Sequence, residues 1–417
     1  MIKYDKYKGT GINWIPLLPQ HWEIKKIGSL FTERREKVSD KEYEPLSVSK
    51  NGITPQLETA VKTDNGDNRK LVIAGDFVVN SRSDRKGSCG ISPLTGSVSL
   101  INIVLKTKGS IIPNYFHYLS RSNDYIEEYY RLGRGIVADL WTTRYSELKN
   151  LQIPYPPQIE QEKIARFIES KTLNIDAYVA ERERELQLLN ELKESEIANI
   201  VTRGLNPNVE MKDSGIPWIG MIPAHWDVVR IKSILSESKE KTDVDGGTLL
   251  SLSQYTGVTL KENAKKVGMF EAESTIGYNV VHPGQFVMNI MLAWNGSYAV
   301  SDYEGVISPA YSVFNFTTNC EKKYYHYLLR LPAYAGAFKT QSKGIIDSRL
   351  RLYPIYFLAF KTIVPPLEEQ QAIVRYIEEK TNKVNSLINE LQAEIDYLKE
   401  YKEKLIADCV TGQIKVD

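Results

Sequence analysis

Two carboxylates and a lysine near residue 140 have a spacing that could support metal-dependent chemistry. Asp139 is followed by Glu147 and Lys149, and carboxylates spaced in this way can hold a divalent cation. The chain contains a second copy of this region, in which Tyr356 and Leu358 take the positions of Glu147 and Lys149. We therefore interpret Asp139 and Glu147 as a loop residue and a helix-cap residue rather than as catalytic groups.

The sequence has no other familiar catalytic or metal-binding motif. It has no phosphate-binding GxxxxGK[ST] loop, and Gly133-Arg134-Gly135 is only a fragment of a dinucleotide-binding GxGxxG loop. Segment 153–157 contains adjacent prolines but lacks the asparagine of the Asn-Pro-Pro-aromatic tetrad of amino-methyltransferases. Three isolated cysteines and five histidines without a HExxH pair indicate neither a disulfide framework nor a zinc site. We expect no catalytic residue, no metal and no cofactor in this chain.

Binding chemistry is better represented than catalysis. Polar and basic side chains gather at the ends of strand-like runs in both halves of the chain. Arginine can form two hydrogen bonds with one guanine, and asparagine or glutamine can form two with one adenine. Lysine and serine suit contacts with phosphates. The candidate DNA-facing residues are Ser49, Lys50, Asn51, Asn80, Arg82, Arg85, Lys86 and Arg134 in the first half and Ser253, Gln254, Tyr255, Asn289, Asn295, Lys343 and Arg349 in the second. For each single residue the alternative is a solvated loop side chain.

These candidates lie in two copies of one sequence pattern. Segment 11–22 returns as 215–226, and segment 156–169 returns as 365–378. The frame repeats, but the loop from Asn80 to Gly90 becomes a longer loop from Asn289 to Gly305. Two recognition domains with a shared frame and different loops are expected to bind two different half-sites. Such an arrangement suits a long, periodic ligand such as duplex DNA.

Each copy closes with a long predicted helix. A Pro-Pro pair precedes each helix, and apolar residues then recur at the heptad spacing of a coiled-coil seam. The predicted helix-pairing residues are Ile175, Val179, Leu186 and Leu189 in the first helix and Val384, Ile388, Leu391, Ile395 and Leu398 in the second. Arg182 interrupts the first seam. The connectivity favours antiparallel helices, with the C-terminus ending near the segment around Trp14.

Composition is that of an ordinary soluble globular protein. The chain has 417 residues, of which 42% are hydrophobic and 25% are charged, and this length suggests two to four domains. The net charge of +1 argues against an autonomous, non-specific DNA binder, although acidic helices can mask basic faces. No apolar run approaches a membrane span and the N-terminus has no signal-peptide core, so we expect a cytoplasmic protein.

The repeated motifs resemble those of the specificity subunits of type I restriction–modification enzymes. The first motif, Gly-Ile-x-Trp-Ile-(x)5-His-Trp, occurs at 11–22 and 215–226. The second, Pro-Pro-x-x-Glu-Gln-(x)4-Arg-aromatic-Ile-Glu, occurs at 156–169 and 365–378, and 202–207 forms the junction between copies. The resemblance covers essentially the whole chain. It implies an α/β (α+β) fold in which two long antiparallel coiled-coil helices join two similar target-recognition domains in an internal pseudo-two-fold repeat.

The resemblance also implies a division of the chain and a set of partners. Residues 1–157 would form target-recognition domain 1, 158–204 a central helical spacer, 205–366 target-recognition domain 2, and 367–417 the C-terminal long helix. Such a subunit is not an enzyme. It binds a bipartite, asymmetric target in double-stranded DNA, together with two methyltransferase (modification) subunits and two restriction (motor/nuclease) subunits. S-adenosylmethionine, ATP and magnesium belong to those partners.

Two other classes of function stay open at this point. A self-sufficient enzyme would need methyltransferase or nuclease motifs, which we do not find in the sequence. A stand-alone coiled-coil scaffold, or a DNA-binding adaptor not tied to restriction, would account for the helices. A scaffold would not, however, need two globular copies with divergent loops.

Overall fold

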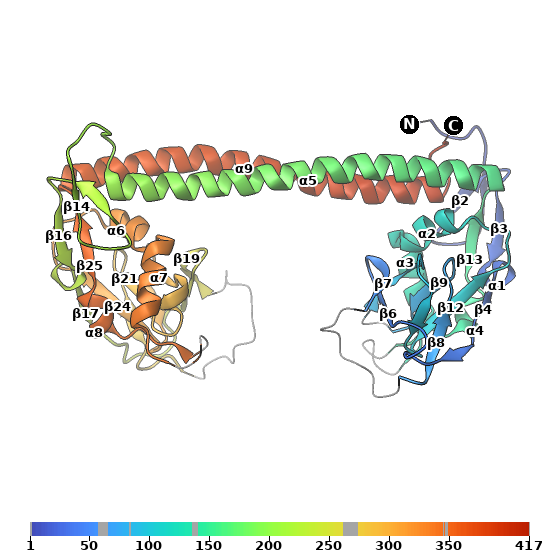
Figure 1. Ribbon diagram of the computed structural model, residues 1–417, viewed down its shortest axis with the longest axis horizontal. Coiled ribbons are helices and arrows are strands. Elements are labelled where there is room, and N and C mark those ends of the chain that lie inside the picture. Colours follow the sequence, from blue (N-terminus) through green and yellow to red (C-terminus); the bar gives the residue numbers. More distant parts are fainter. Residues whose placement is uncertain are drawn as a thin grey trace. The chain divides into compact units, whose positions relative to one another are not determined.

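The computed structural model describes residues 2–56, 66–82, 85–135, 141–261, 274–344, 346 and 349–416. The chain forms two compact units. The first consists of Met1–Arg184 with Leu391–Asp417, and the second of Glu185–Glu390. Each unit therefore contains one globular part and portions of both long helices, α5 (Gln158–Arg203) and α9 (Leu367–Val410) (Figure 1). The predicted division into two target-recognition domains, a helical spacer and a C-terminal helix stays a prediction.

The first unit is built from small antiparallel sheets with helices against them. Its largest sheet has the order β10 (Cys89–Ile91), β9 (Phe77–Asn80), β12 (Asn102–Thr107), β4 (Phe31–Glu33). A second sheet has the order β11 (Gly96–Val98), β8 (Arg69–Val72), β5 (Lys37–Val38). Three pairs complete the strands: β1 (Tyr7–Gly9) with β2 (Leu17–Pro19), β3 (Glu23–Lys26) with β13 (Gln152–Tyr155), and β6 (Leu46–Ser49) with β7 (Gly52–Pro55). The short helices are α1 (Ile27–Leu30), α2 (Pro113–Arg121), α3 (Asn123–Arg131) and α4 (Tyr145–Leu148).

The second unit repeats this topology. Its four-stranded sheet has the order β17 (Leu235–Ser238), β24 (Tyr311–Phe316), β21 (Phe286–Asn289), β22 (Tyr298–Val300). The pairs are β14 (Met211–Asp213) with β15 (Met221–Pro223), β16 (Asp227–Arg230) with β25 (Lys361–Val364), β18 (Leu250–Ser253) with β19 (Gly257–Leu260), and β20 (Asn279–Val281) with β23 (Gly305–Ile307). The short helices are η3 (Ile231–Ser233), η5 (Ala293–Asn295), α6 (Lys322–Leu329), α7 (Pro332–Gln341) and α8 (Pro354–Ala359). The predicted fold, with two similar domains and two paired long helices, is confirmed.

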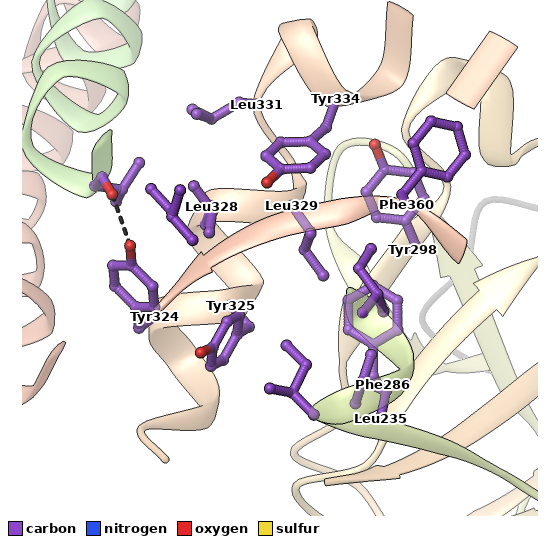
Figure 2. Close-up of a cluster of buried hydrophobic side chains, with 14 of the residues drawn as sticks. Leu235, Phe286, Tyr298, Tyr324, Tyr325, Leu328, Leu329, Leu331, Tyr334 and Phe360 are labelled. Atoms are coloured by element: carbon purple, nitrogen blue, oxygen red, sulfur yellow. Dashed lines mark hydrogen bonds between the residues drawn. The ribbon is translucent and has the colours of Figure 1, made fainter. Parts of the chain in front are cut away.

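Side chains of the central strands point alternately to the two faces of the four-stranded sheet, and a hydrophobic cluster lies on each face. In β21, Phe286 and Met288 belong to the large cluster that faces the helices, whereas Val287 belongs to a smaller cluster beneath the hairpin β18–β19. Successive strand residues point to opposite faces, so one strand can serve both cores. Figure 2 shows the large cluster, in which aromatic and leucine side chains from α6 and α7 cover the sheet. The first unit has the same two clusters, with Phe77 on the helical side of β9 and Val78 on the other.

A glutamate at the start of α5 joins the helix to the globular part of the first unit. Glu160 accepts hydrogen bonds from Trp22 Nε1 (2.9 Å) and from the hydroxyl of Tyr4 (3.0 Å). His21 Nε2 lies 2.6 Å from its other carboxylate oxygen. Trp22 is completely buried, so its indole N–H needs this acceptor. The contact explains why the His-Trp motif and the Pro-Pro-x-x-Glu-Gln motif occur together.

The second unit contains the same contact at the start of α9. Glu369 accepts from Trp226 Nε1 at 3.0 Å, and His225 Nε2 lies 2.6 Å from its other oxygen. The neighbouring Gln370 accepts from the backbone N–H of Glu321 at 2.9 Å and donates to the carbonyl of Pro365 at 2.8 Å. Gln161 makes the equivalent two bonds in the first unit. We refer to each Glu-Trp-His set with its glutamine as the helix clamp.

The other end of a long helix reaches each globular part as well. The hydroxyl of Tyr115 on α2 donates to the carbonyl of Val410 at 3.0 Å, and that of Tyr324 on α6 donates to Val201 at 2.8 Å (Figure 2). Both carbonyls belong to last helical turns, which otherwise lack partners. The glycine that ends α9, Gly412, has a φ of 74°. A positive φ is the usual way for a glycine to stop a helix.

The two chain ends meet within the first unit. The backbone N–H of Lys415 donates to the carbonyl of Ile2 at 2.9 Å, and Gln413 Nε2 donates to the carbonyl of Leu17 at 3.1 Å. The expectation that the C-terminus ends beside the segment around Trp14 is therefore confirmed. In the described ranges, no helix combines the length and the hydrophobicity that crossing a membrane requires.

The portions of α5 and α9 within each unit pair in opposite directions. In the first unit, Lys402 Nζ lies 2.6 Å from Asp176, and Lys399 Nζ lies 2.8 Å from Glu183. Residues further along α5 therefore contact residues that come earlier in α9. In the second unit, Tyr376 bonds Glu196 at 3.0 Å and Lys193 bonds Asn385 at 3.1 Å. Antiparallel pairing is confirmed.

The predicted seam residues lie between the helices or at the edge of their contact. Val179, Leu391 and Ile395 are buried. The other six are half-buried: Ile175, Leu186, Leu189, Val384, Ile388 and Leu398. Arg182, which interrupts the first seam, places its guanidinium 4.7 Å from the ring of Tyr178 and its Nε 3.9 Å from the carboxylate of Glu394. An arginine can occupy this position because its planar cation rests on an aromatic ring beside a carboxylate.

The helix clamp generates a stability prediction. Replacing Glu160 with Ala leaves the buried Trp22 indole N–H without an acceptor, so we expect a loss of about 1–3 kcal/mol in unfolding free energy. Chemical denaturation followed by tryptophan fluorescence would measure it. Glu162→Ala is the matched control, since Glu162 is half exposed and lies 3.8 Å from Arg166 on the same turn. An E160A transition that coincides with the control would contradict the role assigned to the clamp.

Candidate nucleic-acid interface

Six predicted residues lie at or next to the tips of two corresponding hairpins, three in each unit. In β6–β7, Ser49 pairs with Gly52, which leaves a two-residue loop of Lys50 and Asn51. The Oγ of Ser49 accepts from the backbone N–H of Asn51 at 3.1 Å. Lys50 and Asn51 are exposed and Ser49 is half-buried. The hydroxyl of Ser49 thus shapes the turn, while its two neighbours face solvent.

The corresponding hairpin of the second unit is one residue longer. In β18–β19, Ser253 pairs with Gly257, and the loop contains Gln254, Tyr255 and Thr256. The Oγ of Ser253 accepts from the backbone N–H of Tyr255 at 3.0 Å and from that of Thr256 at 3.3 Å. Tyr255 is 84% exposed, whereas Gln254 is half-buried. The two units therefore present chemically different tips on one framework.

An arginine below each hairpin holds its tip. Arg330, which follows α6, donates from Nη2 to the carbonyl of Gln254 at 2.5 Å and from Nη1 to that of Tyr298 at 2.8 Å. Burial lowers the pKa of the Arg330 guanidinium. In the first unit, Arg121 at the end of α2 donates in the same way to the carbonyl of Lys50. Both arginines thus connect a helix end to the tip of a hairpin.

A shallow recess in the first unit brings together more of the predicted residues. Its lining includes Asn80, Arg82, Arg85 and Lys86, together with Tyr130 and Trp141. Three segments distant in sequence meet here, because the backbone of Thr142 bridges both Arg82 and Arg134. Arg82, Arg85 and Arg134 are exposed; Arg82 and Arg85 line the recess, and Arg134 adjoins it through the backbone of Thr142. Cationic groups beside aromatic rings suit the phosphates and bases of nucleic acid.

Carboxylates limit the charge of this recess. Lys86 Nζ lies 2.5 Å from Glu127 and 4.7 Å above the ring of Tyr130. Arg134 Nε lies 3.9 Å from Glu147. The hydroxyl of Ser146 and then the other neighbours hold the pKa of Glu147 below its usual value, so this carboxylate is ionised. Exposed pairs of this kind are weak and can exchange their partners for phosphates.

The second unit has the same framework with other side chains. Lys343 and Arg351 bridge through their backbones, as Arg134 and Thr142 do. Lys343 Nζ lies 5.1 Å from the centre of the Tyr356 ring, and Arg349 is exposed nearby in sequence. The half-buried Asn295 accepts from the hydroxyl of Ser297 at 3.0 Å within the loop that follows η5.

Two predicted asparagines have structural partners in corresponding places. Asn80 Oδ1 accepts from the backbone N–H of Arg82 at 3.0 Å, and Asn289 Oδ1 accepts from that of Met291 at 2.9 Å. Both side chains are buried, with exposed fractions of 9% and 3%. Each asparagine therefore ends a central strand by closing a turn on its own backbone. Contact of either amide with a base stays a prediction.

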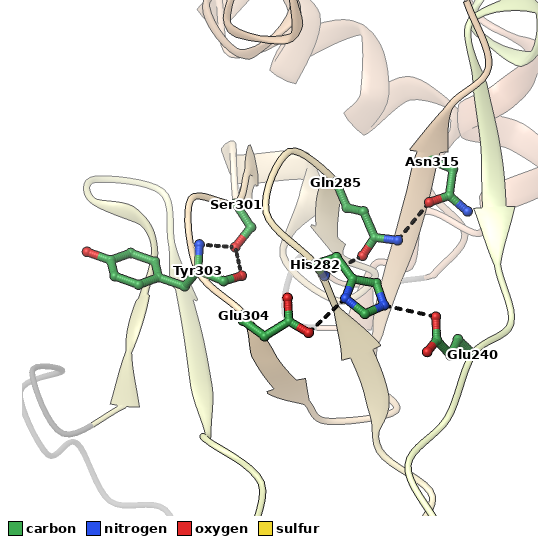
Figure 3. A network of polar contacts seen from close by, with 7 residues as sticks. All are labelled: Glu240, His282, Gln285, Ser301, Tyr303, Glu304 and Asn315. Carbon is green, nitrogen blue, oxygen red and sulfur yellow. Dashed lines mark hydrogen bonds and ion pairs between the residues drawn. The ribbon is translucent and has the colours of Figure 1, made fainter.

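The described residues contain no candidate metal site. Among them, no group of three or more histidine, cysteine, aspartate or glutamate side chains is arranged to hold a metal ion. Asp139, the first residue of the nuclease-like pattern, lies outside the described residues. In Figure 3, His282 lies between Glu304 (2.8 Å) and Glu240 (3.1 Å). The hydrogen bond to Glu240 and the other neighbours raise the pKa of His282. This surface network joins a loop to strand ends.

Several residues of these surfaces are not among the predicted ones. They are Arg121, Tyr130, Trp141, Trp294, Arg330 and Lys339. Arg121 and Arg330 could have been found, because each follows a repeated histidine by four positions, His117 and His326. Burial lowers the pKa of both histidines to about 4, so they are neutral.

Sequence comparison relates the chain to known proteins. Residues 19–188 match the family model of the type I restriction modification DNA specificity domain. The putative type I restriction enzyme MjaX specificity subunit of Methanocaldococcus jannaschii is 22% identical over 453 positions, which cover 99% of this chain and 98% of that protein. The type I restriction enzyme MjaVIII specificity subunit of the same organism is 23% identical, with 96% and 94% covered.

Solved structures share the fold. A chain from a study of the complex assembly and conformational transition of a type I R-M system has a TM-score of 0.69 at 14% identity, and the match covers 95% of this chain and 99% of that one. The HsdS subunit of Thermoanaerobacter tengcongensis has a TM-score of 0.50 at 16% identity, with 95% and 98% covered. The architecture of two similar units with two long helices is therefore shared with these solved chains.

The recess generates a binding prediction. Replacing Arg82 and Arg134 with Ala should weaken binding of duplex DNA, because each change removes an exposed cation, one in the recess and one on the segment that adjoins it. For every phosphate that a variant no longer neutralises, the slope of log affinity against log salt should shrink by about 0.9. Fluorescence anisotropy over a salt series measures both quantities. Arg166→Ala on α5 is the control, since Arg166 is as exposed as Arg134 (81% and 82%). Equal curves for all variants would leave the recess a solvated loop region.

Proposed function

We propose that the chain is a member of the specificity-subunit family of type I restriction–modification systems and is the DNA-recognition subunit of such a complex. Each unit binds one half of a bipartite, asymmetric target. The observation that carries the proposal is the repetition of one framework with different contact surfaces. The sheet order, the helix clamp and the arginine beneath the hairpin all recur, whereas the hairpin tips and the basic residues of the recess do not.

The divergence between the units supports recognition of two different half-sites. The first unit presents Lys50 and Asn51 at its hairpin and the Arg82–Arg134 recess beside it. The second presents Tyr255 at its hairpin. Because base edges differ in their donors, acceptors and methyl groups, side chains of different chemistry select different sequences. Two identical surfaces would instead select a palindrome.

Catalysis belongs to partner subunits in this proposal. The chain binds two methyltransferase subunits, and two restriction subunits join for cleavage. S-adenosylmethionine, ATP and magnesium are used by those partners, and the specificity subunit needs no cofactor of its own. The absence of a metal-binding group among the described residues and of nucleotide-binding motifs in the sequence is compatible with this division.

Methylation by the assembled complex tests the function directly. The chain with its methyltransferase should methylate a bipartite sequence, and neither protein alone should do so. Replacing residues 27–150 with those of a relative should then change only one half of the methylated sequence. This graft leaves the β3–β13 pair with the frame, because β3 ends at Lys26 and β13 begins at Gln152. A change in both halves, in neither half, or methylation by the chain alone would contradict the proposal.

A second test concerns the long helices, which we propose set the gap between the half-sites. Inserting seven residues after Arg184 and seven after Glu390 preserves the polar pairs of α5 with α9 inside each unit, such as Lys193 with Asn385. Seven helical residues add about 10 Å, so the methylated target should acquire a gap about three base pairs longer. An insertion of seven residues in the loop that contains Asp243 is the control. Methylation at the original gap by the helix variant would show that the helices do not set it.

A further inference from the structure

Tyr255 combines strong exposure with a fixed backbone. At 84%, Tyr255 is the most exposed large hydrophobic side chain among the described residues. The loop that carries it is nevertheless tightly bonded. Ser253 Oγ accepts from the backbone N–H groups of both Tyr255 and Thr256, and the hairpin continues in register to Leu250 and Leu260.

Arg330 fixes the same loop from below. Its two hydrogen bonds, to the carbonyls of Gln254 and Tyr298, tie the residue before Tyr255 to strand β22. A guanidinium that is largely desolvated loses more by leaving these acceptors than an exposed one, which stiffens the attachment. At the end of the loop, Gly257 has a φ of 71°, and an added Cβ would lie 3.2 Å from Ala299. These contacts therefore fix the backbone from which the Tyr255 ring projects.

The surroundings of the hairpin favour nucleic acid. An added Cβ at Gly296, directly after η5, would lie 3.9 Å from the Cβ of Gln254, so the η5 loop adjoins the hairpin tip. On that loop, Trp294 has Lys339 Nζ 5.2 Å from its ring centre. The hairpin tip thus carries one exposed aromatic ring, and the adjoining loop carries a second ring with a lysine, a composition that suits bases and phosphates.

On these grounds, and resting on the function proposed above, we propose that Tyr255 is a wedge. Its ring enters one base step of the second half-site and opens the stacking there, and Arg330 is the residue that positions it. Apolar side chains that contact bases in this way unstack a step and kink the duplex. The first unit has Lys50 and Asn51 at this place, so the wedge acts on one half-site only.

The experiment uses the full chain with its methyltransferase and duplexes of the methylated sequence. Each carries 2-aminopurine at one position, because the fluorescence of this base rises when it unstacks. Wild type should raise the fluorescence at one step of the second half-site. Tyr255→Phe should keep the signal, since the ring remains. Tyr255→Ala should abolish it and weaken binding roughly tenfold to a hundredfold. Tyr397→Ala is the control, because Tyr397 is also exposed (67%) but lies on α9.

The outcomes separate the wedge from the proposed function. If wild type methylates a bipartite target but no position of the second half-site brightens, or if the signal survives in Y255A, the wedge is wrong and the proposed function stands. If wild type directs no bipartite methylation, the proposed function itself fails. Arg330→Lys tests positioning: lysine has one nitrogen in place of the two that bond the carbonyls of Gln254 and Tyr298, so the 2-aminopurine signal at the second half-site should fall in part. Methylation of the first half-site should not change. An R330K signal equal to wild type would remove Arg330 from the proposal.

Discussion

The helix clamp is the interaction on which the rest of each unit depends. A single carboxylate, Glu160 in one unit and Glu369 in the other, satisfies the indole N–H of a fully buried tryptophan and contacts a histidine beside it. Because an unsatisfied buried N–H is costly, the first turn of the long helix cannot move independently of the globular part. The glutamine that follows each glutamate adds two bonds to the backbone and fixes the same joint.

This joint explains how a recognition surface can change while its frame stays. The helix-facing core contains the residues that repeat, such as Trp22, Trp226 and the tyrosines Tyr115 and Tyr324. The hairpins and the recess lie on strand ends and loops, where a substitution does not disturb that core. The buried asparagines Asn80 and Asn289 mark the boundary, since each ends a central strand and begins a divergent loop. Under the proposed function, a new specificity needs new loops and leaves the frame intact.

Residues at corresponding positions of the two units also show how one polar contact can replace another within the same framework. In the first unit, Arg34 bonds the buried carboxylate of Asp76 at 2.7 Å. In the second, Gln285 takes the place of Asp76 and donates to Asn315 at 2.7 Å (Figure 3). Both Asp76 and Gln285 accept from a backbone N–H three residues earlier, that of Ile73 or His282. The turn needs an acceptor at this position, and a carboxylate or an amide supplies it.

The sequence by itself determined the repeat, the two long helices, their antiparallel pairing and the absence of familiar catalytic motifs. The helices follow from local spacing, because heptads and Pro-Pro pairs act within a few residues. The repeat and the antiparallel pairing follow from comparing the two copies and from how the chain connects them. Only the tertiary structure decided which polar residues share a surface. Arg82 and Arg134 meet through Thr142, and Arg330 reaches Gln254 across 76 positions of sequence, because strand pairing and helix packing join segments that no local pattern relates. The structure likewise assigned the amides of Asn80 and Asn289 to their own turns, since burial and hydrogen-bond partners are properties of the folded chain.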